Sequence, residues 1–454
     1  MDTQQLNGFK TMNLYRNPFA SPTEEAIGTD FIGRKSVLKK MHEYIINADK
    51  ISNYHIVGLP RIGKSSLLKA FKTMIQENHY SHDLVVLYIS LDECDNSNDM
   101  WRIIGKGIRK ELKKQFHSSD KYTNFIDELD FEDVDENNID YEYVCSVARC
   151  MKASGFLGLI LIDEFDNFST IATKGTVGQV RTLFSGSEYG LRAVVASRRM
   201  VERIEKEVEG ALNSNVSILA STFVNGYKLK AFNEDDMKDY WVSIEEKIGV
   251  AVSNRYKEEI DYYVGTHPCL LNLLNGNFWA EKETKNYICD DDSNLKLSEE
   301  LINKLHDSFN WAVWRDMEKW QLLRSLILST WGPDDEIPNS ELSELERYGI
   351  IDKSQFLSES SGPIRIAISR YFTEWMNLKR YVLPFGDEWS KAEGNMRKIV
   401  KCFCDDMYQG YESKMISHLE TKNANTFEKN VDPRFTAKGR FDAMKNKMSK
   451  AINK

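Results

Sequence analysis

The chain has 454 residues, a length that predicts two to four domains rather than a single core. Hydrophobic residues make up 41% of the sequence, so the chain can bury a core and need not be intrinsically disordered. The formal net charge of -9 argues against general coating of nucleic acid, although a local basic patch is compatible with it.

Two features bear on where the protein works. The seven cysteines have no framework spacing, which predicts free thiols in a reducing compartment. The opening Met-Asp-Thr-Gln-Gln does not have the pattern of a signal peptide, and the apolar run at residues 156–162 is too short to span a bilayer. We therefore expect a soluble, cytoplasmic protein with no membrane partner.

Strand and helix patterns alternate along the first half of the chain. After a polar, irregular stretch at residues 1–30, apolar residues at helical spacing occupy 37–45. Near-continuous apolar runs then predict five strands, at residues 54–57, 84–91, 159–162, 191–196 and 226–231. Strands of this kind, alternating with helices, predict an α/β fold in which helices cover both faces of a parallel sheet.

One stretch matches the phosphate-loop pattern G-x-x-x-x-G-K-[ST] over its full length, Gly58-Leu-Pro60-Arg61-Ile-Gly63-Lys64-Ser65. It lies between a predicted strand and the start of a predicted helix. In such a loop, backbone N–H groups and the helix N-terminus surround the phosphates, the lysine neutralises charge and the hydroxyl holds Mg²⁺. The pattern predicts a P-loop NTPase domain that binds nucleotide and Mg²⁺ through Gly58, Pro60, Arg61, Gly63, Lys64, Ser65 and Ser66.

Two carboxylates, Asp163 and Glu164, follow the third predicted strand. Ligands of a doubly wound sheet bind at the carboxyl ends of its strands. There, Asp163 is placed to hold Mg²⁺ and Glu164 to polarise the attacking water. The alternative is an ordinary strand followed by an acidic helix cap. We expect Asp166 to be an exposed carboxylate at the start of the next helix, with an extension of the site as the alternative.

Polar and cationic residues also follow the fourth predicted strand. Ser197 and Arg198 are placed to reach a γ-phosphate and report its presence, with Lys64, Glu164 and Arg198 forming the catalytic set. We expect Arg199 to be a surface charge. For Arg61, inside the loop, the sequence leaves open a contact with phosphate or with a neighbouring carboxylate.

The segment Gly265-Thr-His267-Pro268 joins two helical patterns, and Pro268 opens the second of them. Two interpretations of His267 stay open. It is either a helix-cap residue or part of a lid that touches the base or the phosphates.

Beyond these motifs, a helix ending in a glycine turn at residues 342–351 and a short strand at 364–368 favour a winged helix. We predict five parts of the chain: an N-terminal segment with a Gly-Arg motif at 1–50, the P-loop domain at 51–231, a helical lid at 232–300, a winged helix at 301–384 and a helical basic tail at 385–454.

Taken in order, these pieces resemble the archaeal-type ATPases of the STAND clade, which are relatives of AAA+ ATPases such as origin-recognition proteins. The resemblance spans residues 14–375 and includes Asn17-Pro18-Phe19, Phe31-Ile-Gly33-Arg34, the phosphate loop and the Gly-x-His-Pro element. It implies that Gly33 and Arg34 lie near the adenine and ribose of ATP and that Pro268 packs on the base. The acidic residue that usually follows the Gly-Arg pair is Lys35 in this chain.

The resemblance also implies a function, that of a slow, regulated ATPase in which ATP controls assembly or the engagement of a partner. The expected partners are ATP and ADP, an effector protein and further copies of the chain. Many bacterial members of the clade act in antiphage defence, and that role is expected here by analogy alone.

The last stretch, residues 433–454, carries seven cations and a single carboxylate. It is a solvated helix end, a contact for DNA phosphates that works with the winged helix, or a docking segment for a partner protein. Two alternatives to the switch therefore stay open: a DNA-binding ATPase, and an ATP-bound assembly scaffold with little turnover.

Overall fold

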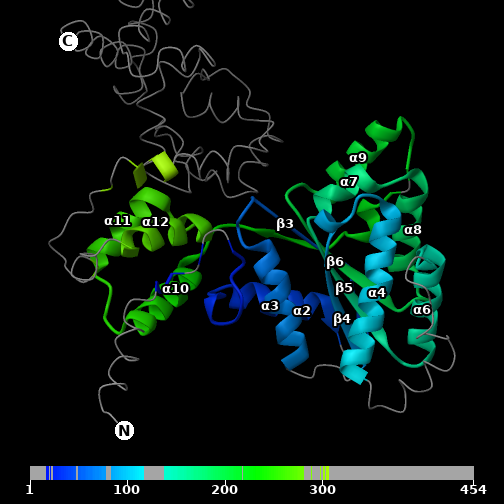
Figure 1. Ribbon diagram of the computed structural model, residues 1–454, viewed down its shortest axis with the longest axis horizontal. Helices are drawn as coiled ribbons and strands as arrows, with labels where there is room; N and C mark the ends of the chain where they lie inside the picture. The colour runs from blue at the N-terminus through cyan, green and yellow to red at the C-terminus, as the bar shows by residue number, and fades with distance from the viewer. Residues whose placement is uncertain are drawn as a thin grey trace, which may run out of the picture. The chain divides into compact units, whose positions relative to one another are not determined.

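A computed structural model of the chain, drawn in Figure 1, describes residues 17–19, 21, 24–47, 50–77, 83–116, 138–216 and 218–280, together with a few positions between 288 and 305. The predicted winged helix, apart from residues 301 and 303–305, and the predicted basic tail lie outside the described residues. Two compact units divide the chain, the first formed by Met1–Val252 and His267–Cys289, the second by Ser253–Thr266 and Asp290–Lys454. In the described ranges, no helix combines the length and apolarity needed to cross a membrane.

A five-stranded sheet forms the centre of the first unit (Figure 1). Its strands have the order β4-β5-β6-β3-β7, and every neighbouring pair is parallel. The parallel sheet is as predicted, and β5 and β6 each extend one residue further at the carboxyl end than their apolar runs. The strands are β3 (Tyr54–Gly58), β4 (Leu84–Ser90), β5 (Leu157–Asp163), β6 (Leu191–Ser197) and β7 (Gly226–Leu229).

The strand order decides which loops meet at the carboxyl edge. β6 lies between β3, which leads into the phosphate loop, and β5, which leads into Asp163. Val57 of β3 is in register with Ser197 of β6, so the two strands end side by side. The chain passes from β3 across two strands to β4 and then returns, which makes β3 the point at which strand order reverses. Ligands of open α/β sheets bind at such a reversal.

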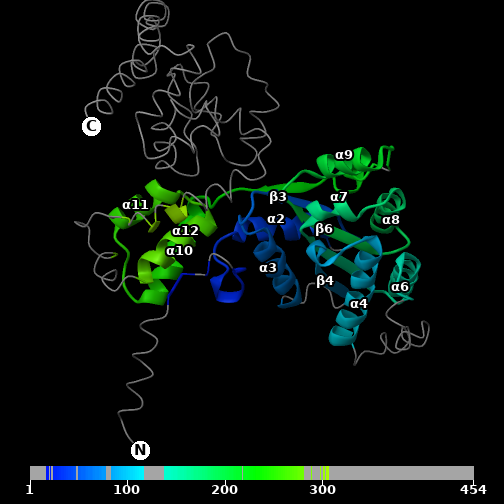
Figure 2. The same ribbon diagram turned by 45° about the horizontal axis from the view of Figure 1, so that its top comes forward.

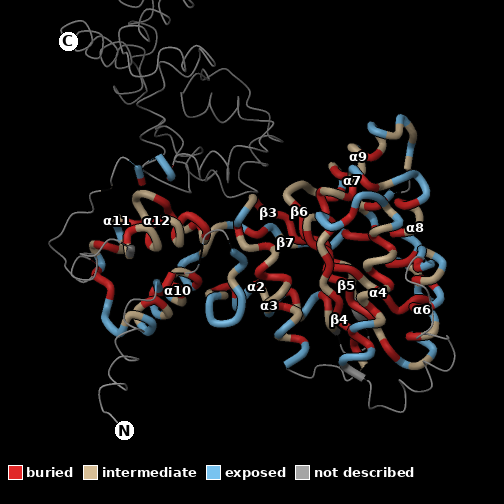
Figure 3. Tube along the Cα trace, viewed as in Figure 1, coloured by how far each residue is buried: buried red, intermediate tan, exposed pale blue. Residues whose placement is uncertain are grey.

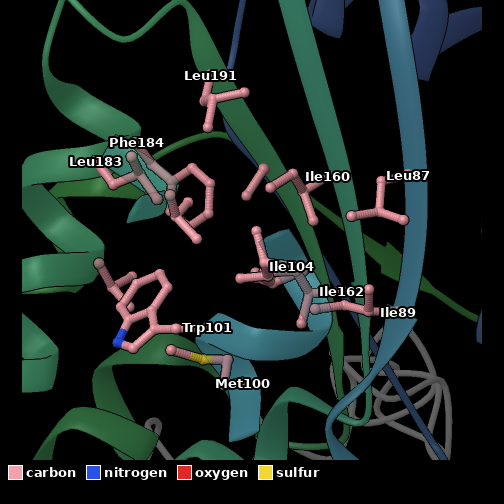
Figure 4. Close-up of a cluster of buried hydrophobic side chains, with 14 of the residues drawn as sticks. Leu87, Ile89, Met100, Trp101, Ile104, Ile160, Ile162, Leu183, Phe184 and Leu191 are labelled. Carbon is pink, nitrogen blue, oxygen red and sulfur yellow. The ribbon is translucent and has the colours of Figure 1, made fainter. Parts of the chain in front are cut away.

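Helices cover both faces of the sheet, as Figure 2 shows from a second direction. The face opposite α3 (Lys64–Glu77) carries a core of buried side chains from β4, β5, β6 and five α-helices, and the buried stretches are red in Figure 3. Trp101, Ile160 and Phe184 belong to this core (Figure 4). The indole N–H of Trp101 donates to Gln179 at 3.2 Å. The five helices are α4 (Ser97–Phe116), α6 (Tyr141–Ala153), α7 (Phe168–Ile171), α8 (Lys174–Ser185) and α9 (Val201–Leu212).

Side chains of each strand alternate between these two faces. Leu87 and Ile89 of β4 point into the core of Figure 4, so Tyr88 between them points to the face of α3. Ile160 and Ile162 of β5 do the same, which leaves Asp163 on the α3 face. This alternation brings Tyr88 and Asp163 to the same side of the sheet.

Short elements complete the first unit. They are α2 (Lys35–Ile45), the antiparallel pair β1 (Ile46–Asn47) and β2 (Lys50–Ile51), α7 (Phe168–Ile171) and the 3-10 helices η2 (Gly28–Asp30), η3 (Leu91–Glu93), η5 (Phe165–Asn167) and η6 (Ala220–Thr222).

Three helices follow β7. α10 (Glu234–Ile248) begins with a capping box, in which Asn233 and Asp236 accept each other's backbone N–H groups. α12 (Pro268–Ala280) belongs to the same unit as the sheet. α11 (Asn254–Val264) belongs to the second unit, and the Ser253 hydroxyl caps it by accepting from Tyr256 N at 3.1 Å.

The start of the described chain is held by α10 and α12. The Asn17 amide donates to the Gly276 carbonyl at 3.1 Å, and Phe19 packs edge-on against Trp279. Lys247 of α10 forms an ion pair with Asp30 at 2.8 Å. These contacts connect residues 17–30 to helices more than 200 positions away in the sequence.

Candidate active site

The phosphate loop has the backbone that its pattern demands. Gly58 ends β3 and α3 begins at Lys64. A Cβ on Gly58 would lie 2.7 Å from the Leu229 carbonyl oxygen, so only glycine allows β7 to approach here. Gly63 has a φ of 97°, and Arg61 adopts a φ of 56° in the left-handed region. The turn therefore aims the first N–H groups of α3 into the loop.

Lys64 places a buried positive charge at the end of this loop. It is 6% exposed, and its ammonium donates to the carbonyls of Gly58 at 3.1 Å and Leu59 at 3.0 Å. Burial lowers the pKa of Lys64, while Glu164, Asp166 and Asp163 oppose that shift, in that order. Carboxylates at and just after the carboxyl end of β5 thus act on the pKa of the lysine that follows β3. Ser65, half-buried, and Ser66, buried, lie in the same first turn of α3.

Asp163 and Glu164 differ in their surroundings. Asp163 is 2% exposed and accepts from Glu164 N at 2.9 Å and from the Tyr88 hydroxyl at 2.8 Å. Glu164 is half-buried and has a φ of 47°, a conformation that costs a non-glycine residue free energy and that recurs at functional sites. Burial raises the pKa of Glu164, and Lys64 lowers it in turn.

Asp166 corrects one prediction. It is 1% exposed and lies beneath the end of β6, so the expectation of an exposed carboxylate is wrong. Its oxygens accept from Arg198 N at 2.5 Å, from Arg199 N at 3.1 Å and from Arg199 Nε at 2.8 Å. Arg199 is accordingly no plain surface charge, because it also forms an ion pair with Glu207.

This network leaves Arg198 half-buried at the edge of the sheet, with its Nε 3.6 Å from Asp166. Ser197 has a different environment. It is 0% exposed, and its hydroxyl donates to the Arg199 carbonyl at 2.5 Å. Since that proton is committed, the His55 Nε2 at 2.8 Å is the donor to the Ser197 oxygen. The serine of the predicted sensor pair is thus engaged by protein groups.

Gly33 and Arg34 meet the start of α10. The Arg34 backbone N–H donates to Asp236 Oδ1 at 2.5 Å, and the guanidinium donates to the carbonyls of Lys230 at 2.6 Å and Ile62 at 3.4 Å. Burial lowers the pKa of Arg34 to about 10, against the opposing effect of Asp236. Arg34 therefore links α2, the phosphate loop and α10. Lys35 forms an exposed ion pair with Asp239 at 3.0 Å.

The start of α12 also lies against the phosphate loop. Burial raises the pKa of the Cys269 thiol, and the charge of Arg61 in the phosphate loop opposes that shift. His267 is 0% exposed, and neither of its ring nitrogens reaches a hydrogen-bonding partner in the described part of the chain. Its ring is thus no hydrogen-bonding helix cap. Burial lowers the pKa of His267 to about 3, with Arg34 and Lys64 acting in the same direction. Pro268 is half-buried beside it.

Two buried histidines predict a loss of stability in acid. Burial lowers the pKa of His55 to about 4 and that of His267 to about 3, both below the value of about 6.5 expected in the unfolded chain. Below pH 6.5 the unfolded state therefore binds protons that the folded state does not. Each histidine is expected to remove about 2 kcal/mol of unfolding free energy between pH 6.5 and pH 5.

The measurement is urea denaturation at pH 7.5 and pH 5 for the wild type, His55→Gln and His267→Gln. Each variant is expected to lose less stability on acidification than the wild type. A variant that loses as much would show that its histidine does not titrate in this way.

The residues present fit a magnesium site of the kind that relies on substrate phosphates. Asp163 would supply one carboxylate and Ser65 one hydroxyl. The described residues contain no group of three or more His, Cys, Asp or Glu side chains that could hold a metal ion. Mg²⁺ is commonly bound by one or two carboxylates with phosphate and water completing its octahedron.

Sequence reasoning missed three residues of this region: His55, Tyr88 and Asp236. Asp236 forms a capping box with Asn233, which is a local pattern, but it also accepts from the Arg34 N–H, which lies 202 positions away. His55 and Tyr88 are single residues with a polar group inside otherwise apolar strand segments. Such a position is as typical of a core residue as of a functional one.

No protein-family model matches the sequence, and no curated protein matches it. Among solved structures, the chain is similar to a Walker-type ATPase of Pyrococcus abyssi, with 14% identity and a TM-score of 0.49 over 78% of this chain and 97% of that one. It is also similar to the Aeropyrum pernix ORC1 protein in complex with DNA, at 13% identity and a TM-score of 0.38 over 77% and 93%. For a RuvB variant of Thermotoga maritima the values are 14% and 0.35 over 75% and 93%.

Because these identities and TM-scores are low, we assign the fold from the strand order and the phosphate loop of this chain. The parallel sheet of order β4-β5-β6-β3-β7, with Gly58–Ser65 joining its reversal strand to α3, is a P-loop NTPase α/β fold.

Proposed function

We propose that this protein binds ATP with Mg²⁺ and hydrolyses it slowly, as a molecular switch of the STAND/AAA+ type. The observation that carries the proposal is the convergence of the phosphate loop and the acidic end of β5 at one edge of the sheet. Glu164, Asp166 and Asp163 all raise the pKa of the buried Lys64 ammonium, against the effect of its burial. A cation, a metal-binding carboxylate and a base in one place are the parts that phosphoryl transfer to water requires.

Each residue has a role in the proposed reaction. The first turn of α3 and Lys64 bind the phosphates, and Ser65 and Asp163 would hold Mg²⁺, which neutralises charge on the phosphate oxygens when bound. Glu164 accepts a proton from the attacking water. Arg198, half-buried at the end of β6, reaches toward the terminal phosphate, while the Ser197 hydroxyl positions the strand end through His55.

The switch is supported by contacts between the phosphate loop and the helices after β7. Arg34 donates to Ile62 inside the loop and to Asp236 on α10, and the charge of Arg61 in the loop acts on the pKa of the Cys269 thiol on α12. A nucleotide that moves the loop would therefore act on both helices. Contact with an effector or with further copies, and a role in antiphage defence, stay predictions of the resemblance. Contact with DNA stays a prediction from the basic tail and the predicted winged helix.

The Lys64→Ala variant tests the binding half of the proposal. Its buried ammonium hydrogen-bonds the Gly58 and Leu59 carbonyls at the start of the loop and would neutralise phosphate charge there, so its loss is expected to abolish Mg-ATP binding. The measurement is isothermal titration of the purified full chain, with thermal unfolding to show that the variant folds. Lys35→Ala, which removes an exposed lysine, is the control. Unchanged ATP affinity in Lys64→Ala would contradict the proposal.

A further inference from the structure

Tyr88 is a half-buried tyrosine on β4 that the proposed reaction does not use. It lies on β4, in register with Leu161 of β5, and Ser90 two residues later is in register with Asp163. Both Tyr88 and Asp163 face α3. The phenol hydroxyl therefore reaches diagonally along the strand end and donates to Asp163 Oδ2 at 2.8 Å.

The hydrogen bonds of Asp163 hold its carboxylate in one orientation. Oδ2 accepts from Tyr88 and Oδ1 accepts from the Glu164 backbone N–H at 2.9 Å. Because each carboxylate oxygen can accept two hydrogen bonds, one lone pair on each oxygen stays available to a metal ion. The side chain is 2% exposed, so these two donors, rather than bulk water, fix its plane.

The Tyr88 ring is itself held in place. The Lys69 ammonium of α3 lies 4.8 Å from the ring centroid, within the range of a cation–π contact. Lys69 in turn forms an ion pair with Glu25, in the segment before α2. A chain of three contacts thus runs from residue 25 to the carboxylate at the end of β5.

We propose that Tyr88 is a positioning residue that orients Asp163 for Mg²⁺. The inference rests on the proposed function, since it concerns the metal that Asp163 would hold. Outer partners of this kind fix a ligand's orientation, and their removal costs about 10- to 100-fold in metal affinity. Tyr88 thereby sets the Mg²⁺ concentration at which the site fills, while the affinity for metal-free nucleotide does not depend on Tyr88.

The test compares the wild type, Tyr88→Phe and Tyr143→Phe. Tyr143 is a matched control, because its buried hydroxyl has no hydrogen-bond partner in the described part of the chain. Binding of a fluorescent ATP analogue is measured in EDTA and then across a Mg²⁺ titration, and Mn²⁺ binding in the presence of ATP is followed by electron paramagnetic resonance. Tyr88→Phe is expected to raise the Mg²⁺ midpoint about tenfold or more and to weaken Mn²⁺ binding equally, with the affinity in EDTA unchanged. Tyr143→Phe is expected to match the wild type.

A Mg²⁺ midpoint for Tyr88→Phe equal to that of the wild type would overturn the inference and leave the proposed function intact. An equal loss of affinity with and without metal would also overturn it, because that pattern reflects general damage to the fold. If the wild type binds no nucleotide, the proposed function itself fails. Should Tyr88→Phe not fold, Lys69→Gln replaces it. Lys69→Gln removes the cation that holds the Tyr88 ring and is also expected to raise the Mg²⁺ midpoint. An unchanged Mg²⁺ midpoint in Lys69→Gln counts against the inference.

Discussion

Glu164→Gln is expected to lower ATP turnover by about 10²- to 10⁴-fold while leaving Mg-ATP binding in place. The amide has the shape of the carboxylate but cannot accept the proton of the attacking water. Glu164 lies at the end of β5, at the same edge as Lys64, and acts on the lysine's pKa more than any other carboxylate. Phosphate release in single- and multiple-turnover assays measures the loss.

The pH dependence of wild-type turnover supplies a second readout. Burial raises the pKa of Glu164, so the base becomes protonated at a higher pH than an exposed glutamate. Wild-type turnover is expected to fall as the pH drops through that raised pKa. The residual turnover of Glu164→Gln is expected not to fall in this pH range. Wild-type turnover in Glu164→Gln would show that another group activates the water.

The same variant tests whether ATP controls assembly, because it is expected to hold ATP without consuming it. Size exclusion with static light scattering compares Glu164→Gln with and without Mg-ATP. We expect a larger species only with Mg-ATP. An unchanged monomer that retains nucleotide would contradict nucleotide-gated self-assembly and favour a switch that awaits another protein.

Asp166→Ala is expected to lower the free energy of unfolding by about 3–5 kcal/mol. The carboxylate is 1% exposed and accepts the backbone N–H groups of Arg198 and Arg199 and the Nε of Arg199. Alanine leaves these donors without their acceptor at a buried position, which costs free energy because an unsatisfied buried donor loses its hydrogen bond to water. Urea denaturation followed by tryptophan fluorescence measures the change.

Asp235→Ala is the control for this prediction. Its carboxylate is 90% exposed and pairs with an exposed lysine at 3.3 Å, an interaction that water and salt screen. We expect no measurable change in stability there. If Asp166→Ala unfolds at the urea concentration of the wild type, the network beneath β6 does not hold the strand end. Where Asp166→Ala still folds, its turnover is expected to fall as well, since Arg198 loses its backbone anchor.

The sequence by itself determined the parts of this protein whose signals are local. Apolar runs predicted the strands, because a parallel strand buried on both faces leaves no polar alternation. The phosphate loop was readable from Gly58 to Ser65 because its backbone geometry demands glycines at set places and a lysine and a hydroxyl at its end. Asp163 and Glu164 were readable because they follow a buried strand directly.

Only the tertiary structure decided which polar groups meet. Asp166 reads in the sequence as an exposed helix-start carboxylate, and it is buried because β6 pairs beside β5 and brings Arg198 and Arg199 over it. Arg34 finds Asp236 and Tyr88 finds Asp163 for the same reason, across 202 and 75 positions of chain. Strand order and register set these encounters, and neither follows from the periodicity of a single segment, since a partner distant in sequence leaves no local mark.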